Sequence, residues 1–406
     1  MTARTLNAQA LSRDEVARYA RHILLPGVGM AGQERLSAAR VLVVGAGGLG
    51  SPALLYLAAA GVGTIGIVDA DVVETSNLQR QVVHSDADVG RLKTASAAET
   101  VAAVNPHVTV VRHDVRLDAS NALDVLRDYD VVVDGTYNFP TRYLVNDACV
   151  LLGIPHVWGS IYRFDGQVSV WWAGHGPCYR CVFPEPPPPG AVPSCAEGGV
   201  LGVLCAAIGS VQVTETVKIV LGLGETLTGR LLVHDALRMT WDTLPVRRDP
   251  GCPVCGDDPS ITLATGLVDY EAFCGMPVGA VSGADPAAGP GADLPLVSVS
   301  SLAAALASET SPLLVDVRGD DERSIAAIPT AVAIHLDAFR DGTAYARREL
   351  ADAVAAGRPV VIHCKVGGRS AEAARLALAA GLTGVASLDG GVLAWVHEID
   401  PSQPEY

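Results

Sequence analysis

The chain has 406 residues, of which 49% are hydrophobic and 18% charged, and its formal net charge is −15. This composition is typical of two or three globular domains and excludes a disordered chain, while the negative charge argues against non-specific nucleic-acid binding. Because the N-terminal stretch lacks the apolar core of a secretion signal and no apolar run reaches membrane-spanning length, we expect a cytoplasmic protein with reduced cysteines and no membrane contact.

The first part of the chain alternates short apolar segments with longer amphipathic ones, from Arg40 to about Asp257. The pattern predicts strands at 40–45, 64–69, 108–115 and 130–135, and helices at 49–61 and 94–104. Such an alternation is typical of a mostly parallel α/β sheet with helices on both faces. Further strands of mixed direction are predicted at 155–160, 166–172 and 229–244.

A stretch rich in glycine, alanine and proline at 281–293 predicts a linker. A second, smaller α/β unit follows, with strands predicted at 296–300, 313–318, 331–336 and 359–364 and helices at 301–309, 344–357 and 370–381. We therefore divide the chain into a first domain at 1–257, a linker at 258–293 and a second domain at 294–406.

A glycine-rich turn directly follows the first predicted strand and precedes a helix. It contains Gly45, Gly47 and Gly50 in a G-x-G-x-x-G pattern, and Asp69 ends the next strand. The glycines allow a phosphate chain to approach the positive end of the helix, and the carboxylate accepts hydrogen bonds from a ribose. The pattern indicates a nucleotide site but does not distinguish NAD from ATP; the alternative is a turn that serves packing only.

The segment after Asp69 favours ATP. It carries Asn77, Arg80 and Lys93, and two cations beside an amide suit a triphosphate better than a neutral nicotinamide ring. The alternative is that these side chains form ordinary solvated surface.

Two cysteine pairs have the spacing of a metal site. They are Cys178 with Cys181 and Cys252 with Cys255, each in a C-x-x-C pattern. Four thiolates predict a closed, tetrahedral, structural Zn²⁺ site that ties together distant segments. The alternative, a pair of redox dithiols, lacks the strand-to-helix junction typical of such sites.

Cys364 lies directly after an apolar strand, in a six-residue loop that ends at Arg369 and leads into a helix. The loop amides, the helix N-terminus and Arg369 provide positive potential that favours a thiolate or a persulfide. We therefore predict a sulfur-transfer cysteine; the alternative is a buried cysteine at a strand end.

Together these motifs resemble the MoeB/ThiF family of ubiquitin-activating-like enzymes fused to a C-terminal rhodanese domain. The resemblance covers nearly the whole chain and includes "RYARHILLPGVGMAGQERL", "GAGGLGSP", "SNLQRQVVHSDADVG", "PCYRCVFPE", "DPGCPVCG" and "DVRGDDERSIAAIPTAV". It implies a Rossmann-like adenylation domain with structural zinc, followed by a rhodanese sulfurtransferase domain.

The family resemblance implies a two-step reaction. ATP with Mg²⁺ adenylates the C-terminal Gly-Gly of a ubiquitin-like sulfur-carrier protein, and a rhodanese persulfide then converts the carrier to a thiocarboxylate. By the same resemblance, thiosulfate or a cysteine desulfurase would supply the sulfur, the enzyme would be a homodimer, and molybdopterin biosynthesis would be one of several pathways that use such activation.

The resemblance also assigns site residues. Arg80 and Lys93 would hold the phosphates, Arg21 would reach the site of the neighbouring subunit, and Cys195 matches a cysteine that some relatives use to hold the carrier covalently, with a bystander thiol as the alternative. The nucleotide positions are Gly45, Gly47, Gly48, Gly50, Asp69, Asp71, Ser76, Asn77, Leu78, Gln79, Arg80, Lys93, Tyr137 and Asn138.

Tyr137 departs from the family pattern, which has an aspartate that coordinates magnesium at this place. A phenol is neutral and a poor magnesium ligand. Three interpretations follow: another acid such as Asp71 serves, the site accepts a different substrate geometry, or adenylation is lost and the protein is an adaptor that docks the carrier and acts only as a sulfurtransferase. Cys205, where relatives usually carry proline, is interpreted as packing.

Overall fold

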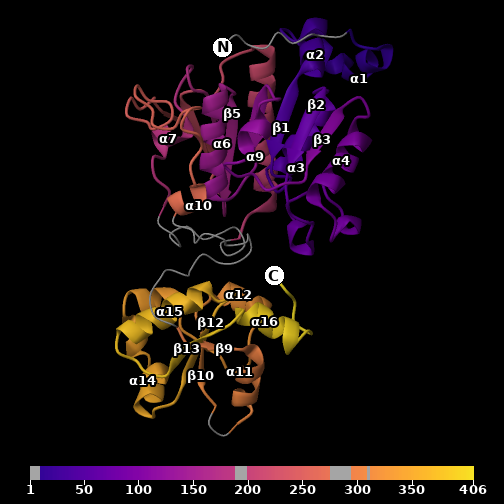
Figure 1. Cartoon of the computed structure of the whole chain (residues 1–406). Helices are drawn as coiled ribbons and strands as arrows, with labels where there is room; N and C mark the ends of the chain where they lie inside the picture. Colours follow the sequence, from indigo (N-terminus) through magenta and orange to yellow (C-terminus); the bar gives the residue numbers. More distant parts are fainter. Residues whose placement is uncertain (1–9, 188–198, 275–293, 309–310) are drawn as a thin grey trace. The chain divides into compact units, whose positions relative to one another are not determined.

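The computed structural model describes residues 10–187, 199–274, 294–308 and 311–406. The chain divides into two compact units, the first continuing to Cys274 and the second described from Leu294 onward (Figure 1). The predicted end of the first domain at residue 257 stays a prediction; in the structure, residues 258–274 belong to the first unit and include a short helix.

The first unit combines eight strands with helices. Its strands are β1 (Arg40–Val44), β2 (Thr64–Val68), β3 (Thr109–His113), β4 (Val131–Asp134), β5 (His156–Tyr162), β6 (Asp165–Trp171), β7 (Arg230–Asp235) and β8 (Thr240–Pro245). Its helices are α1 (Arg13–Ile23), α2 (Gly29–Ala38), α3 (Gly50–Ala60), α4 (Lys93–Val104), α5 (Ala122–Leu126), α6 (Phe139–Leu152), α7 (Tyr179–Val182), α9 (Gly202–Leu221) and α10 (Tyr270–Phe273), with short 3-10 turns at Thr75–Asn77 and Asp86–Asp88.

The strands of this unit form one mixed sheet in the order β3-β2-β1-β4-β5-β6-β7-β8. Strands β1 to β5 pair in parallel, and β6, β7 and β8 continue the sheet antiparallel. The chain runs outward from β1 to β3 and then returns to place β4 on the other side of β1. In open α/β sheets ligands bind at such a reversal, beyond the carboxyl ends of the strands.

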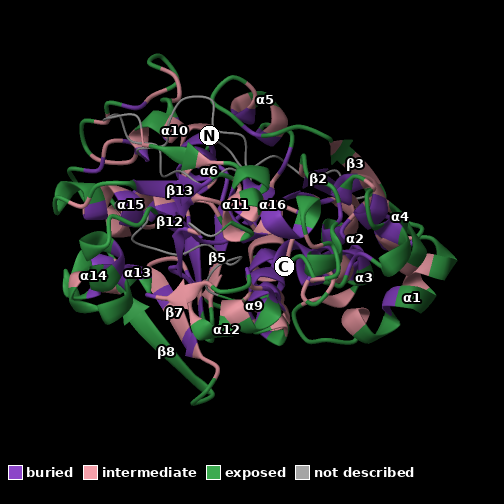
Figure 2. Cartoon of the chain, turned by 90° about the horizontal axis from the view of Figure 1, so that it is seen from below, coloured by how far each residue is buried: buried purple, intermediate pink, exposed green. Residues whose placement is uncertain are grey.

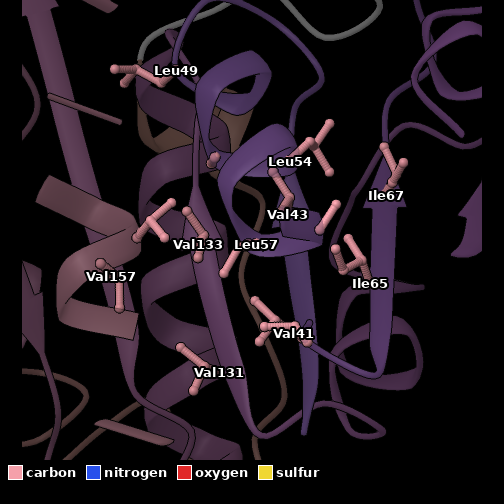
Figure 3. Packing of buried hydrophobic residues seen from close by; sticks show 14 of the residues in the cluster. Val41, Val43, Leu49, Leu54, Leu57, Ile65, Ile67, Val131, Val133 and Val157 are labelled. Carbon is pink, nitrogen blue, oxygen red and sulfur yellow. The ribbon is translucent and has the colours of Figure 1, made fainter. Parts of the chain in front are cut away.

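The core of the first unit explains why the apolar segments form strands. Successive residues Val41, Leu42 and Val43 of β1 are all fully buried, so both faces of the strand are covered. Figure 3 shows side chains of β1, β2, β4 and β5 packed with Leu54 and Leu57 of α3. Burying each such side chain contributes about 1.5–3 kcal/mol, which outweighs local preference.

Helix α9 is long and apolar enough, by length and composition, to span a membrane, a case that the sequence analysis did not anticipate. Its residues Leu204, Ile208 and Gly209 are buried, and it packs on α3 and on strands β4, β5 and β6. A buried core helix of a globular unit passes the same length and composition test, and these contacts are those of a core helix.

The second unit contains a five-stranded parallel sheet in the order β11-β10-β12-β13-β9. Its strands are β9 (Leu296–Val297), β10 (Leu313–Asp316), β11 (Val332–Ala333), β12 (Val360–His363) and β13 (Val385–Leu388). Its helices are α11 (Val299–Leu306), α12 (Asp320–Ile325), α13 (Leu336–Arg340), α14 (Arg348–Ala355), α15 (Gly368–Ala379) and α16 (Gly391–Glu398), with a 3-10 turn at Thr343–Ala346.

The elements of the second unit differ from prediction in several places, because α12, α13 and α16 were not predicted and the strand predicted at 331–336 is limited to β11. The strand predicted at 296–300 ends at Val297, because Ser298 caps α11 by accepting a hydrogen bond from the Ser301 amide at 3.2 Å. The strand β13 at Val385–Leu388 was not predicted, although all four of its residues are buried. Figure 2 shows which residues of each unit are buried. In the first unit, β8 is exposed along its whole length.

Candidate functional site

The glycine-rich turn lies at the chain reversal of the first sheet. Val44, the last residue of β1, is paired in register with Asp134, the last residue of β4. The turn after β1 and the segment after β4 therefore leave the same edge of the sheet, side by side. This is the edge at which an α/β sheet of this topology binds ligands.

Two glycines of the turn are required by its geometry. Gly45 has a φ of +90°, which side-chain-bearing residues rarely adopt. A Cβ on Gly50 would lie 1.8 Å from the carbonyl oxygen of Gly45, so only glycine lets α3 begin there. The backbone thus turns sharply into a helix N-terminus, the conformation that suits a phosphate. Gly47 lies in the same turn, and Gly48 lies against the Cys205 thiol and the Arg80 side chain.

Asp69 is held beside the turn by two backbone amides. Its Oδ2 accepts a hydrogen bond from the Ala46 amide at 2.9 Å, and its Oδ1 accepts one from the Asp71 amide at 2.8 Å. Burial raises the pKa of the Asp69 carboxyl, and the charge of Lys93 opposes that rise. Each carboxylate oxygen keeps a further lone pair, so the group is oriented to accept hydrogen bonds from a ribose.

His84 contacts the backbone of the glycine-rich turn, and no local sequence signal indicated this role. Its Nε2 lies 2.9 Å from the Ala46 carbonyl oxygen and its Nδ1 lies 2.8 Å from the Ser96 hydroxyl. Burial lowers the pKa of His84, so the ring is neutral, with Nε2–H donating to Ala46 and Nδ1 accepting from Ser96. The imidazole thereby fixes a backbone carbonyl within the glycine-rich turn.

The predicted phosphate-binding side chains lie after Asp69. Lys93 is buried at the start of α4, and its Nζ lies 3.1 Å from the half-exposed Asp71 carboxylate. Arg80 donates to the Ser76 carbonyl at 3.0 Å, and Asn77 is buried. Both cations are thus held on the segment that follows Asp69. Leu78 is half-buried, and Ser76 and Gln79 are exposed.

The acid that ends β4 already has hydrogen-bond partners within the protein for both of its carboxylate oxygens. Asp134 is completely buried, and its Oδ1 accepts from the Thr136 amide at 2.8 Å and the Thr136 hydroxyl at 2.6 Å. Its Oδ2 lies 3.0 Å from His156 Nε2. These partners leave Asp134 with a structural role. Tyr137 is 59% exposed, and Asn138 caps α6 by accepting from the Thr141 amide at 2.8 Å.

The four cysteines of the two C-x-x-C motifs come together although 70 residues separate the pairs. All four Sγ atoms lie within 4.8 Å of one another, and the contacts that join them measure 3.3–3.8 Å. A tetrahedral zinc with Zn–S bonds of about 2.3 Å requires sulfur atoms about 3.8 Å apart. The cluster fits a structural Zn²⁺ ion.

A buried ion pair supports the first cysteine motif. Arg180, between Cys178 and Cys181, donates to both oxygens of Asp147 at 2.8–3.1 Å, and both side chains are almost inaccessible. The Tyr270 hydroxyl of α10 donates to the same carboxylate at 2.8 Å. The first C-x-x-C motif is therefore anchored to α6 and to the segment that follows the second C-x-x-C motif.

Cys364 follows β12 and is fully buried. The Gly367 amide lies 3.1 Å from its Sγ, and the Ser370 hydroxyl lies 3.5 Å from it. Gly367 has a φ of +118°, which turns the loop around the sulfur before α15 begins. Donors that converge on a sulfur atom stabilise its anionic form. The loop thus has the geometry to hold a thiolate or a persulfide.

The charged residues around this loop form a paired network. Arg369 makes a bidentate ion pair with Glu322 of α12, with both N–O distances at 2.7 Å. Arg318 is buried and donates to both carboxylate oxygens of Asp316 at the end of β10. Burial alone would raise the pKa of Glu322, but hydrogen bonds from Arg369 lower it. The positive charge predicted from Arg369 is therefore balanced by a carboxylate.

Two further predicted site residues are Cys195 and Arg21. Cys195 lies outside the described residues. Arg21 is exposed in the last turn of α1, and the exposed apolar residues Leu24 and Leu25 follow it. Sequence reasoning also missed Arg142, a buried residue of α6 that donates to the Ser160 hydroxyl at 3.0 Å. Its place four residues after Asn138 is the only local signal.

Comparisons with known proteins match this geometry. The model of the ThiF family matches residues 19–254, and that of the rhodanese-like domain matches residues 298–398. The chain is 50% identical over 403 residues to the Mycobacterium tuberculosis "Probable adenylyltransferase/sulfurtransferase MoeZ", covering 98% of this chain and 97% of the relative.

Two further proteins are similar to the first unit or share its fold. A Thermus thermophilus "Sulfur carrier protein adenylyltransferase" is 57% identical over 270 residues, covering 65% of this chain and 98% of the relative. The crystal structure of E. coli MccB with MccA-N7isoASN has a TM-score of 0.53 at 22% identity, covering 59% of this chain and 74% of that one, and shows the shared fold. The adaptor alternative finds no support in these relatives. The chain belongs to the ThiF family, in the form that carries a C-terminal rhodanese-like domain.

Proposed function

We propose that this protein is an adenylyltransferase and sulfurtransferase that activates the C-terminal glycine of a ubiquitin-like sulfur-carrier protein with ATP and then converts it to a thiocarboxylate. The names of the near full-length relatives support both activities. The observation that carries the proposal is that one chain holds both a glycine-rich turn with a fixed acid at Asp69 and a cysteine loop at Cys364.

In the first step the chain binds and orients ATP. The turn from Gly45 to Gly50 offers backbone amides to the phosphates, and Asp69 accepts the ribose hydroxyls. Lys93 and Arg80 neutralise the charge that develops as the carrier carboxylate attacks the α-phosphorus and pyrophosphate leaves. The product is a carrier acyl-adenylate.

Magnesium would assist this step, and Asp71 is an exposed acid on the segment that also carries Lys93. Asp71 is half-exposed beside Lys93, whereas Asp134 is consumed by hydrogen bonds to Thr136 and His156. Magnesium often uses only one or two protein carboxylates and keeps several waters. Asp71 is therefore the proposed ligand, and Tyr137 contributes no metal ligand.

In the second step the rhodanese unit supplies sulfur. A persulfide on Cys364 attacks the acyl-adenylate, AMP leaves, and an acyl disulfide forms between the carrier and Cys364. A second thiol then attacks the Cys364 sulfur of that disulfide, which releases the carrier thiocarboxylate and leaves a new disulfide. The Gly367 amide and the Ser370 hydroxyl hold the anionic sulfur before transfer.

The remaining assignments complete the proposal. Zn²⁺ on Cys178, Cys181, Cys252 and Cys255 is structural, because four thiolates leave no open position for chemistry. The protein acts as a cytoplasmic homodimer, and the exposed apolar residues Leu24, Leu25 and Met30, which follow Arg21 in the sequence, are proposed to meet the neighbouring subunit. Thiosulfate or a cysteine desulfurase provides the sulfur, and molybdopterin biosynthesis is one pathway that such a carrier serves.

The test pairs two measurements on purified protein. Carrier-dependent ATP–pyrophosphate exchange is measured with each Gly-Gly-ending carrier encoded in the same genome, and the carrier is then weighed by mass spectrometry for replacement of one oxygen by sulfur. We expect exchange with at least one carrier, and a thiocarboxylate with thiosulfate present. The Cys364→Ala variant should retain exchange and form no thiocarboxylate. Absence of exchange with every carrier, or thiocarboxylate formation by Cys364→Ala, would refute the proposal.

A further inference from the structure

Tyr406 lies beside the cysteine loop of the second unit, outside every motif considered above. Its half-buried ring packs against the core that contains Ile328 and Trp395. Arg318 donates a hydrogen bond to its hydroxyl oxygen, and that hydroxyl lies 3.4 Å from Glu322 of α12. The chain end marked C in Figure 1 accordingly lies next to α12.

The ring of Tyr406 also contacts the cysteine loop itself. The Nζ of Lys365 lies 4.6 Å from the ring centroid, in the range of a cation–π contact. Lys365 is the residue directly after Cys364, and its side chain is largely buried. One tyrosine therefore touches the first cation of the loop directly.

The same tyrosine reaches the other end of the loop through one intermediate. Glu322 contacts the Tyr406 hydroxyl and holds Arg369, the last loop residue, by two hydrogen bonds of 2.7 Å. Arg318, which donates to Tyr406, is itself fixed by Asp316 at the end of β10. The network thus joins both ends of the six-residue loop to the rigid end of the sheet.

We propose that Tyr406 is a positioning residue of the sulfurtransferase site, which holds the loop cations Lys365 directly and Arg369 through Glu322 in the places where they meet an anionic sulfur donor. This inference rests on the proposed sulfurtransferase function. Burial raises the pKa of Tyr406 to about 12, so the phenol stays neutral and the contact with Lys365 is that of a cation with an uncharged ring.

The chemistry on which Tyr406 acts is the first half of sulfur transfer. The Cys364 thiolate attacks the outer sulfur of thiosulfate, the sulfur–sulfur bond of thiosulfate breaks, and sulfite leaves with the bonding electron pair. Cyanide then attacks the terminal sulfur of the persulfide, which gives thiocyanate and restores the thiolate. Because the donor is a dianion, correctly placed cations lower its KM more than they raise kcat.

The experiment compares Tyr406→Leu, Tyr406→Phe, Lys365→Met and the double variant Lys365→Met/Tyr406→Leu in the full chain, with thiosulfate and cyanide. We expect Tyr406→Leu and Lys365→Met each to raise the KM for thiosulfate roughly tenfold or more with kcat within roughly twofold, because the first loses the contact that places the lysine and the second loses the cation itself. Tyr406→Phe keeps the ring and should recover most of the loss. The double variant should be less than multiplicative, because the effect of Tyr406 through Lys365 disappears with the lysine and only its effect through Glu322 and Arg369 remains.

The matched control is Tyr345→Leu, which removes another half-buried tyrosine from the same unit, one that packs on Phe339. It should lower the thermal midpoint about as much as Tyr406→Leu does and leave the KM unchanged. An unchanged KM in Tyr406→Leu, an equal rise in Tyr345→Leu, or multiplicative effects in the double variant would overturn the inference. A wild-type protein without any sulfur transfer would instead refute the proposed function.

Discussion

At the scale of single residues, the candidate nucleotide site depends on hydrogen bonds that orient its carboxylate and its backbone carbonyl. Asp69 is oriented by the Ala46 and Asp71 amides, and His84 holds the Ala46 carbonyl from the opposite side. Asp134, the acid nearest to Tyr137 in sequence, uses its carboxylate oxygens in contacts with Thr136 and His156. The site therefore separates structural carboxylates from those that can meet a ligand.

Replacement of Tyr137 by aspartate tests which acid binds magnesium. Because Tyr137 is exposed and Asp71 is the proposed ligand, we expect Tyr137→Asp to change kcat/KM of carrier-dependent exchange less than about fivefold, or about 1 kcal/mol. Asp71→Asn, the matched control, removes charge stabilisation worth several kcal/mol and should lower activity roughly 100-fold or more. A gain of orders of magnitude in Tyr137→Asp would instead restore the adaptor interpretation.

At the scale of elements, each chemical group lies where a strand gives way to a helix. The glycine-rich turn joins β1 to α3, Asp134 ends β4 and Tyr137 lies between β4 and α6, and the Cys364 loop joins β12 to α15. Buried strands fix the start of each loop, and helix N-termini direct amides at its contents. The cysteine cluster is different, because it joins α7 to a turn after β8 and serves the stability of the unit.

Loss of one cysteine ligand should remove zinc and destabilise the first unit. We expect Cys252→Ser to abolish the one bound zinc per chain measured by elemental analysis. We assume that the free energy of unfolding falls by about 3 kcal/mol, which is less than the binding free energy of structural zinc sites. In a unit of this size, that loss lowers the thermal midpoint by about 6–12 °C. Cys274→Ala, a buried cysteine outside the cluster, should keep its zinc. Full zinc content in Cys252→Ser would contradict the assignment.

His363, the last residue of β12, should make the stability of the second unit depend on pH. Burial lowers the pKa of His363 to about 4, whereas an unfolded histidine has a pKa of about 6.5. Between these values the unfolded chain binds more protons, so stability is fully present above pH 6.5 and is lost as the pH falls towards 4. The loss amounts to at most roughly 3 kcal/mol.

Hydrogen exchange of the peptide that contains β12 measures this effect between pH 6.5 and 5. Its free energy of opening should fall with pH in the wild type and fall less in His363→Asn, which has no titratable ring. His335→Asn, an exposed histidine of the same unit, is the control and should keep the wild-type slope. Identical slopes in the wild type and His363→Asn would show that the histidine does not set the pH response.

At the scale of the whole molecule, the chain joins two units with separate sheets and separate cores. One activates a carboxylate and the other carries sulfur, so a single chain keeps a reactive acyl-adenylate and its sulfur source together. The proposed homodimer adds a further dependence, because Arg21 would serve the site of the neighbouring subunit.

Mixing two inactive variants tests the dimer. Arg21→Ala and Lys93→Ala should each abolish exchange, because each site lacks one cation. A mixed dimer contains one site with Lys93 from one subunit and Arg21 from the other, so random mixing should recover about one quarter of wild-type activity. Arg13→Ala, an exposed arginine in the first turn of the same helix, should be active by itself. No recovery after verified subunit exchange would exclude a shared site.

The sequence by itself determined the local features of this protein. Strands and loops that depend on short patterns, such as β1 with the turn at Gly45 and β12 with the loop at Cys364, were predictable because burial and backbone geometry act within a few residues. Apart from the four-cysteine cluster, which the paired C-x-x-C spacing indicated, only the tertiary structure decided what requires contacts between distant segments. The support of His84 for the turn, the engagement of Asp134 by His156, the pairing of Arg369 with Glu322 and the place of Tyr406 depend on how the chain folds back, because a side chain's partners across a sheet leave no periodic signal in the sequence.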